Sequence, residues 1–452
     1  MKDLLEETMK RANNYLESLS ERNVAPSREA VARLAKLSRP FPEQGLDADA
    51  VLAELGEFCS PATMATAGPR FFGFVVGGSL PAALAANWLA GAWDQPASFY
   101  EEMPATAFLE QIALGWLTDI FRLPPGCGVG FVTGATMANF AGLAAARHAV
   151  LERAGWNVER DGLFGAPPIT VVVGAEAHVS LMKSLGLLGL GRTRVVRVPV
   201  DGQGRMRAEA LPATSGPTII CVQAGNVNTG AFDPFPEICK RAHSAGAWVH
   251  VDGAFGLWAL ACPSRSYLTS GIEQADSWAT DAHKWLNVPY DSGLAFVREP
   301  DALRAAMAIG AEYLPPTTEH RKPSDYTPES SRRARGVEVW AALRSLGRSG
   351  LSDLIERTCN HAKRFAEGLN AAGYEILNDV VLNQVLVSFG DAETTRKVIA
   401  ELQEEGSCWC GGTVWQGHTA MRISVSSWAT TKADVDRSLE AMLRIASKHA
   451  RH

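Results

Sequence analysis

The stretch AWVHVD, residues 247–252, decides the fold class of this 452-residue chain. It is short, apolar and rich in β-branched residues, and it follows a helical pattern that ends at Gly246. Such a stretch predicts a buried parallel strand, here one that ends in a carboxylate. Because ligands of α/β folds bind at the carboxyl ends of their strands, the sequence predicts an α/β protein with Asp252 at a ligand site.

A second stretch, DAHKW at residues 281–285, places Lys284 directly after His283. A lysine held beside a histidine suits an enzyme that binds an aldehyde cofactor covalently. The ring nitrogen of pyridoxal 5′-phosphate (PLP) needs a nearby carboxylate to stay protonated, and Asp252 fits that role. Taken singly, these residues would be a buried turn aspartate and a surface lysine, but their order and context together predict a PLP site.

Three stretches resemble one family: QAGNVNTGAFDPF (223–235), HVDGAFG (250–256) and TDAHKWLNVPYDSG (280–293). Together they resemble the group II PLP-dependent amino-acid decarboxylases, which include aromatic-amino-acid, glutamate and diaminobutyrate decarboxylases. The ordered resemblance runs from about Pro69 to Thr431. It implies a fold-type I, PLP-dependent transferase-like architecture with a mainly parallel, seven-stranded sheet. It also implies a homodimer whose subunits share their active sites.

The pattern along the chain predicts three parts. Residues 1–68 are expected to form a helical amino-terminal arm, which in the family wraps a partner subunit. Residues 69–335 alternate apolar strands with helices and form the expected large PLP-binding domain. Residues 336–452 contain helical stretches, two strands and a closing helix, which predict a small α+β carboxyl-terminal domain.

Composition narrows the class of protein. A hydrophobic content of 46% is ample for a large core, and a net charge of −6 argues against nucleic-acid or anionic-membrane partners. The amino terminus is charged throughout, and no apolar run is long enough to cross a membrane. The eight cysteines show no zinc-type spacing, so we expect reduced thiols and no metal. These features favour a cytoplasmic enzyme.

The phosphate of PLP needs a cradle, and residues 128–140, GVGFVTGATMANF, supply a strand, a turn of small residues and the start of a helix. Amides at a helix start attract anions. Gly134, Ala135 and Thr136 are therefore the expected phosphate ligands.

The resemblance assigns further cofactor contacts. It implies that His178 stacks on the cofactor ring and that Ala254 lies against the opposite face, whereas a lone His178 would more simply cap a helix or face solvent. His283 is expected to touch the phosphate or shuttle a proton, unless it is scaffold only. Asn226 or Asn228 is expected near the cofactor O3′, and the choice between them is open.

One position departs from the aromatic decarboxylases, which have NPHK where this chain has DAHK at residues 281–284. An ionised carboxylate cannot donate a hydrogen bond to phosphate. Asp281 is therefore not among the expected phosphate ligands.

The resemblance also assigns a proton donor. Tyr313 aligns with a tyrosine that lies on a mobile loop of the neighbouring subunit and protonates the carbanion after carbon dioxide has left. Relatives with phenylalanine there make an aldehyde, so Tyr313 favours plain decarboxylation, unless it is a packing residue at a loop hinge. Arg332 and Arg333 resemble paired arginines of which one reaches the phosphate across the interface, although a solvated basic turn explains them too.

The substrate pocket is expected to include Phe74 and Tyr100, whose rings favour a flat, apolar side chain. Glu101 and Glu102 lie nearby in the sequence and could instead pair with a cationic substrate, unless they are surface residues. Arg422 is a candidate for holding a carboxylate or for a structural ion pair.

These features predict an enzyme that converts an L-amino acid, first of all an aromatic one, into its amine and carbon dioxide. Decarboxylation of a diamino or acidic amino acid remains an alternative. An aldehyde synthase, an aminotransferase and an aldol-type lyase are alternatives on the same fold. A catalytically silent PLP-binding scaffold is the non-enzymatic alternative, against which Lys284, Asp252 and His178 argue.

Overall fold

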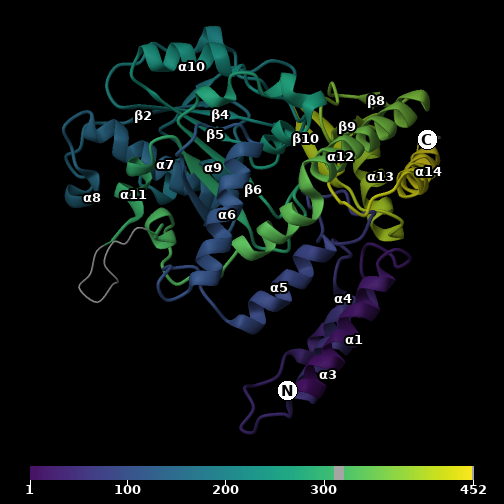
Figure 1. Ribbon diagram of the computed structural model, residues 1–452. Helices are drawn as coiled ribbons and strands as arrows, with labels where there is room; N and C mark the ends of the chain where they lie inside the picture. The colour runs from purple at the N-terminus through teal and green to yellow at the C-terminus, as the bar shows by residue number, and fades with distance from the viewer. Residues whose placement is uncertain (310–319, 450–452) are drawn as a thin grey trace.

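The computed structural model describes residues 1–309 and 320–449 and is built around a seven-stranded sheet (Figure 1). The strand order is β1-β7-β6-β5-β4-β2-β3, and β7 runs antiparallel to both of its neighbours. The other pairings are parallel, which confirms the predicted sheet and the fold-type I architecture. The strands are β1 (Gly128–Val132), β2 (Thr170–Gly174), β3 (Val196–Val198), β4 (Thr218–Gln223), β5 (Trp248–Asp252), β6 (Ser277–Asp281) and β7 (Gly293–Val297).

Helices cover both faces of this sheet because its strands are apolar on both sides. One face packs against α7 (Ala135–Glu152), α9 (Val179–Leu187) and α11 (Pro300–Met307). The other packs against α6 (Pro104–Ile120), α10 (Phe235–Ser244) and the first half of α12 (Gly336–Ala371). The sheet is therefore the centre of a three-layer structure.

Helix α12 is bent at Gly347, where φ is +61°. A positive φ is outside the helical range and suits glycine, which has no Cβ to clash. The sequence predicts two helical stretches in this region, and the structure joins them into one bent element that links the two sheets.

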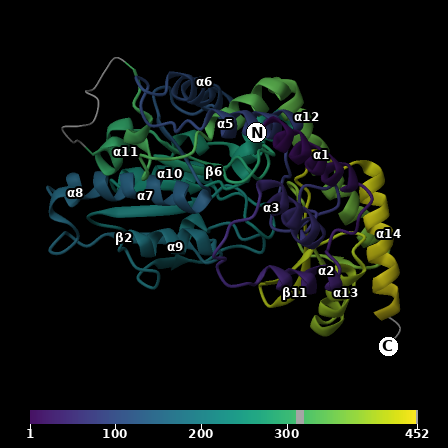
Figure 2. The ribbon, with the colours of Figure 1, turned by 90° about the horizontal axis from the view of Figure 1, so that it is seen from below.

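The second sheet is antiparallel, in the order β10-β11-β9-β8. Its strands are β8 (Glu375–Ile376), β9 (Gln384–Ser388), β10 (Gly411–Trp415) and β11 (His418–Ser424). Helices α13 (Ala392–Glu405) and α14 (Lys432–His449) pack with it around a separate core. Figure 2 shows α14 at the end of the molecule opposite α8 (Val158–Asp161).

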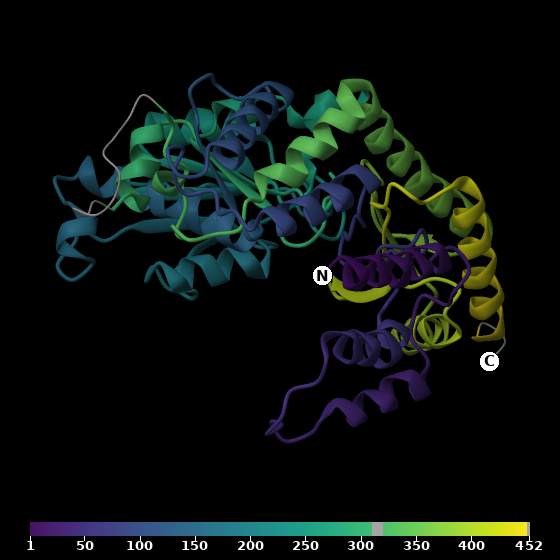
Figure 3. The same ribbon diagram turned by 60° about the horizontal axis from the view of Figure 1, so that its bottom comes forward.

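The amino-terminal helices project from this body (Figure 3). They are α1 (Lys2–Ser18), α2 (Arg28–Arg33), α3 (Ala48–Glu54) and α4 (Ser60–Ala62), followed by α5 (Pro81–Trp93). None of α1, α2 and α3 contains a buried residue. Short 3-10 or π-helical segments complete the described chain, at Leu34–Leu37, Leu55–Cys59, Ala208–Ala210, Gly256–Ala261, Pro263–Thr269, Ile272–Gln274 and Pro323–Tyr326.

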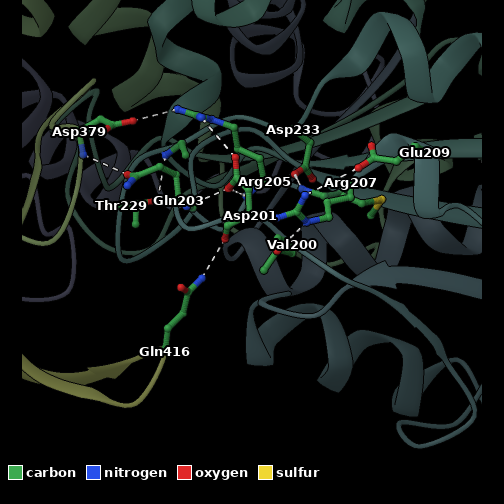
Figure 4. A network of polar contacts seen from close by, with 12 residues as sticks. Val200, Asp201, Gln203, Arg205, Arg207, Glu209, Thr229, Asp233, Asp379 and Gln416 are labelled. Atoms are coloured by element: carbon green, nitrogen blue, oxygen red, sulfur yellow. Dashed lines mark hydrogen bonds and ion pairs between the residues drawn. The ribbon is translucent and has the colours of Figure 1, made fainter.

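A polar network joins the two sheets (Figure 4). Arg205 lies 3.3 Å from the carboxylate of Asp201 and 3.4 Å from that of Asp379, and Gln416 donates to the Asp201 carbonyl at 2.9 Å. Gln203 accepts a hydrogen bond from the Asp379 amide at 3.0 Å. These contacts fix the edge of the small sheet against the region that follows β3.

In the part of the chain that the structure describes, no helix is both long and apolar enough to cross a lipid bilayer. The same residues contain no group of three or more His, Cys, Asp or Glu side chains arranged to hold a metal ion. The boundaries of the three predicted parts, 1–68, 69–335 and 336–452, remain a prediction.

Candidate active site

The carboxyl ends of β2, β5 and β6 meet at one edge of the large sheet. β5 ends at Asp252 and β6 ends at Asp281, while Lys284 lies in the turn that follows β6. His178 follows β2 and precedes α9. The charges of Asp252, Lys284, Arg422 and Asp281 all act on His178, so these groups lie close together. The structure thus brings the three predicted ring and amine residues, Asp252, His178 and Lys284, to one place.

Asp281 holds the amine of Lys284. Its Oδ2 lies 2.9 Å from the Lys284 Nζ, and its Oδ1 accepts a hydrogen bond from the Ala135 amide at 2.5 Å. The Asp281 side chain is only 3% exposed, and the Lys284 side chain is 19% exposed. One buried carboxylate therefore ties the lysine to the first amide of α7.

The start of α7 forms a close-fitting cradle. The Ala138 amide donates to the Gly134 carbonyl, so the amides of Thr136 and Met137 precede the first intrahelical hydrogen bond. A Cβ on Gly134 would lie 3.2 Å from His283 Cε1, and a Cβ on Gly293 would lie 2.5 Å from Gly134 Cα. The helix start thus faces the site with free amides and little side-chain bulk, as an anion requires.

Asp252 is buried and held from two sides. Its Oδ2 accepts a hydrogen bond from Asn139 Nδ2 at 3.2 Å, and its Oδ1 accepts one from the Ala254 amide at 3.3 Å. The carbonyl of Ala254 in turn accepts the Asp281 amide at 2.9 Å. These bonds fix the Asp252 carboxylate and bring the turn that contains Ala254 beside β6.

Burial lowers the pKa of His178, although the nearby Asp252 carboxylate opposes the shift. His178 Nδ1 accepts the Ser180 amide at 3.2 Å and so caps α9. Burial also lowers the pKa of His283, whose Nδ1 accepts the Ser292 amide at 3.2 Å. Both histidines are therefore neutral near pH 7, and the Nε2 of His283 carries the hydrogen and lies 3.7 Å from Asp281 Oδ1.

The two candidate asparagines differ in their contacts. Asn226 Oδ1 accepts the amides of Asn228 and Thr229 at 2.9 and 3.3 Å, so its side chain shapes its own loop. Asn228 Oδ1 lies 3.1 Å from Thr413 Oγ1 and 3.4 Å from Arg422 Nη1. Asn228 therefore links this loop to the small sheet, and which of the two contacts the cofactor remains a prediction.

Arg422 on β11 is partly buried, and burial lowers its pKa. Its Nη1 donates to the Val227 carbonyl at 3.3 Å and to Asn228 Oδ1 at 3.4 Å. The charge of Arg422 acts on His178, which places the guanidinium beside the site.

Contacts with distant parts of the chain hold the turn that contains Lys284 in place. Asn287 Nδ2 donates to the carbonyls of Trp285 and Ser426 at 2.8 and 3.0 Å. A Cβ on Gly77 would lie only 1.7 Å from the Lys284 carbonyl oxygen. The lysine turn thus requires a residue without a side chain at position 77.

We therefore expect Gly77→Ala to lower the free energy of unfolding by about 1–3 kcal/mol or more, because backbone must move to admit the methyl group. Thermal unfolding and the PLP content of the purified protein measure the effect. Gly202→Ala is the control, since a Cβ there meets no atom within 4 Å. Equal stability of the two variants would contradict the close approach.

The predicted pocket residues lie in aromatic contacts. Phe74 has a φ of +53° and is 62% exposed as a residue, and its ring lies 5.3 Å from the ring of Trp409. Tyr100 stacks on His320 at 3.8 Å. Glu101 and Glu102 are exposed in the turn before α6. The substrate roles of these residues remain predictions.

Tyr313 lies outside the described residues. The paired arginines after it, Arg332 and Arg333, have different surroundings, and Arg332 is not in a solvated turn. Arg332 is buried, and its Nη2 lies 2.8 and 2.9 Å from the carboxylate oxygens of Glu110. Arg333 pairs with Glu338 and donates to the Tyr290 carbonyl at 3.4 Å. The Tyr290 ring lies 4.3 Å from that of His283, so Tyr290 connects Arg333 to this site.

Sequence reasoning missed two site residues. The signal for Asn139 in the sequence was a polar residue within an alanine-rich helical stretch. In the structure its side chain is fully buried. Asp281 was set aside because it cannot donate to phosphate. The structure gives it a different task, which is to accept hydrogen bonds from Ala135 and Lys284.

Comparison with known proteins identifies the family. A model described as "Pyridoxal-dependent decarboxylase conserved domain" matches residues 32–390. An L-2,4-diaminobutyrate decarboxylase of Rhizobium meliloti (strain 1021) is 30% identical over 434 residues, which cover 91% of this chain and 85% of that protein. Tryptophan decarboxylase 1 of Oryza sativa subsp. japonica is 27% identical over 458 residues, which cover 92% and 87%. The crystal structure of Oryza sativa TDC with PLP and tryptamine matches with a TM-score of 0.90 at 23% identity, covering 99% of this chain and 97% of that chain.

The chain belongs to the pyridoxal-dependent decarboxylase family. It is a PLP-dependent carboxy-lyase that acts on an amino acid. The residues present fit the cofactor, because one buried edge offers an amine, a carboxylate and helix-start amides for its aldehyde, ring nitrogen and phosphate.

Proposed function

We propose that this enzyme decarboxylates an aromatic L-amino acid to its amine and carbon dioxide. The observation that supports an aromatic substrate is the exposed Phe74, whose ring packs against Trp409. Trp409 stacks on Phe71 with ring centroids 5.0 Å apart, which holds it in place. A flat side chain would gain contact area and favourable ring geometry on such a surface.

The cofactor supplies an electron-accepting ring conjugated to the carbon that joins the substrate amine. Lys284 would provide the amine that binds PLP covalently, with Asp281 to orient it. The Asp252 carboxylate would keep the ring nitrogen protonated, and neutral His178 and Ala254 would contact the cofactor ring. The Thr136 region of α7 would hold the phosphate, with His283 nearby.

Tyr313 protonates the product carbon after carbon dioxide has left. We expect Tyr313→Phe to lower the ratio of amine to aldehyde by about tenfold or more, with hydrogen peroxide formed alongside the aldehyde. Mass spectrometry of products and a coupled peroxide assay measure both. Tyr326→Phe is the control, and an unchanged ratio in Tyr313→Phe would remove the proton-donor role.

A diamino acid is the second candidate substrate, because the 30% identical relative is a diaminobutyrate decarboxylase. The exposed Glu101 and Glu102 are the groups that would pair with its cationic side chain. Comparing kcat/KM for aromatic, acidic and diamino L-amino acids decides between the two. The highest value for an aromatic substrate supports the first proposal, and the highest value for a diamino acid supports the second.

The active sites are proposed to be shared in a homodimer, in which the amino-terminal arm and α5 contact the partner. The support is the exposed apolar surface that these helices present. Leu5 and Met9 of α1 are 58% and 44% exposed, and Leu89 and Trp93 of α5 are 55% and 43% exposed.

We expect the double substitution Leu89→Glu and Trp93→Glu to convert the dimer into a monomer and to reduce activity by about tenfold or more, because buried charges oppose association. Light scattering coupled to gel filtration measures the mass. Phe164→Glu is the control, since Phe164 is 98% exposed but lies on another part of the surface. A dimer of unchanged stability would place the interface elsewhere.

A further inference from the structure

A line of buried polar side chains lies behind Asp252. Alternate residues of β5, Trp248, His250 and Asp252, lie on the face of the sheet that α7 covers, because side chains alternate along a strand. Val249 and Val251 belong to the core on the opposite face. A strand that is apolar on one face therefore carries three polar groups in a row on the other.

These groups form one continuous series of hydrogen bonds. Trp248 Nε1 lies 2.8 Å from Ser277 Oγ, which lies 2.8 Å from His250 Nδ1. His250 Nε2 lies 2.9 Å from Asn139 Oδ1, and Asn139 Nδ2 lies 3.2 Å from Asp252 Oδ2. The series thus runs from β5 through β6 and α7 and back to the end of β5.

The two ends give every bond in the series one direction. The Asp252 carboxylate can only accept, so Asn139 turns its NH₂ group toward Asp252 and its Oδ1 toward His250. Asn139 Oδ1 therefore accepts from His250 Nε2, and the Nδ1 of neutral His250 accepts the hydrogen of Ser277 Oγ. The Ser277 oxygen in turn accepts from Trp248, whose indole N–H can only donate.

The surroundings keep this arrangement fixed. Asn139, His250 and Ser277 are fully buried, and burial lowers the pKa of His250 to about 3, so its ring is neutral at physiological pH. A Cβ on Gly142 would lie 2.8 Å from His250 Cε1, so the ring packs directly on the backbone of α7. The imidazole has no room to flip without moving the helix.

We propose that Asn139 and His250 are positioning residues, which aim the Asp252 carboxylate at the ring nitrogen of PLP through this one-way series. The proposal rests on the proposed role of Asp252. Without the series, the Asn139 amide loses the donor that fixes its oxygen and can move away from Asp252, so the carboxylate loses a hydrogen bond and can turn. Asp252 then holds the proton on the ring nitrogen less well.

The test uses the holoenzyme reconstituted with PLP that carries ¹⁵N in its ring. The ¹⁵N chemical shift reports whether the ring nitrogen is protonated, independently of turnover. Asn139→Leu and His250→Leu break the series, whereas His250→Gln keeps an N–H donor at its centre. Val249→Ala is the matched control, because Val249 is equally buried on the same strand but faces the other core.

We expect Asn139→Leu and His250→Leu to move the shift toward the unprotonated value and to lower kcat by about tenfold or more, with KM changed by less than about threefold. His250→Gln and Val249→Ala are expected to stay close to the unsubstituted enzyme. Ser277→Ala removes only a hydroxyl and gives the same test if a leucine variant does not fold. It is expected to move the shift in the same direction.

A normal shift in Asn139→Leu, or in Ser277→Ala if the leucine variant does not fold, overturns the proposal, as does an equal effect of Val249→Ala. Asp252→Asn separates this failure from that of the proposed function. If Asp252→Asn changes the shift and the variants of the series do not, only the positioning role is wrong. If Asp252→Asn leaves the shift unchanged, the assignment of Asp252 itself is wrong.

Discussion

Lys284→Ala is expected to abolish covalent attachment of PLP and to lower kcat by roughly 10³-fold or more, the scale seen when a residue that acts covalently is removed. The reason is that the described part of the site places this amine, 2.9 Å from Asp281, beside both Asp252 and His178. Mass spectrometry after borohydride reduction measures attachment, and amine production measures turnover.

Lys240→Ala controls for the loss of a lysine as such, since Lys240 is exposed on α10. It is expected to retain both attachment and activity. If the Lys284→Ala enzyme still carried covalently bound cofactor after reduction, another amine would be the one that binds PLP.

Asp252→Asn is expected to lower kcat by roughly a hundredfold or more while the protein still folds and binds PLP. Asparagine keeps the shape and can still accept from Asn139, but it lacks the charge that holds a proton on the ring nitrogen. Each unit by which the pKa of that nitrogen falls is about a tenfold change in its protonation. Steady-state kinetics and PLP titration measure the two effects.

Asp301→Asn is the control, because the side chain of Asp301 is 93% exposed on α11. Near-normal turnover in Asp252→Asn, with bound cofactor, would mean that the ring nitrogen does not need this carboxylate.

Sequence alone predicted the large sheet because its strands are short, apolar and β-branched, and because they alternate with helical stretches. It could not predict that β7 is antiparallel and lies between β1 and β6, since strand order depends on pairings between distant segments. The small α+β part was likewise visible from its pattern, whereas the bend of α12 at Gly347 depends on how the two halves pack.

The sequence predicted that Asp252, Lys284 and His178 lie close together, because each stands at or just after the end of a strand at the same sheet edge, and their roles remain predictions. The roles of Asp281 and Asn139 could not be predicted, because each depends on a contact with a residue more than a hundred positions away. The substrate cannot be read from the same features, since the aromatic rings at Phe74 and the exposed glutamates favour different side chains. The cytoplasmic location remains a prediction from composition.

The most direct test of decarboxylation is the stoichiometry of products from one amino acid, with and without added PLP. We predict one amine and one carbon dioxide for each amino acid consumed, no hydrogen peroxide, and full dependence on PLP. A keto acid as the main product, or an aldehyde with peroxide, would contradict the assignment of this chain as an amino-acid decarboxylase.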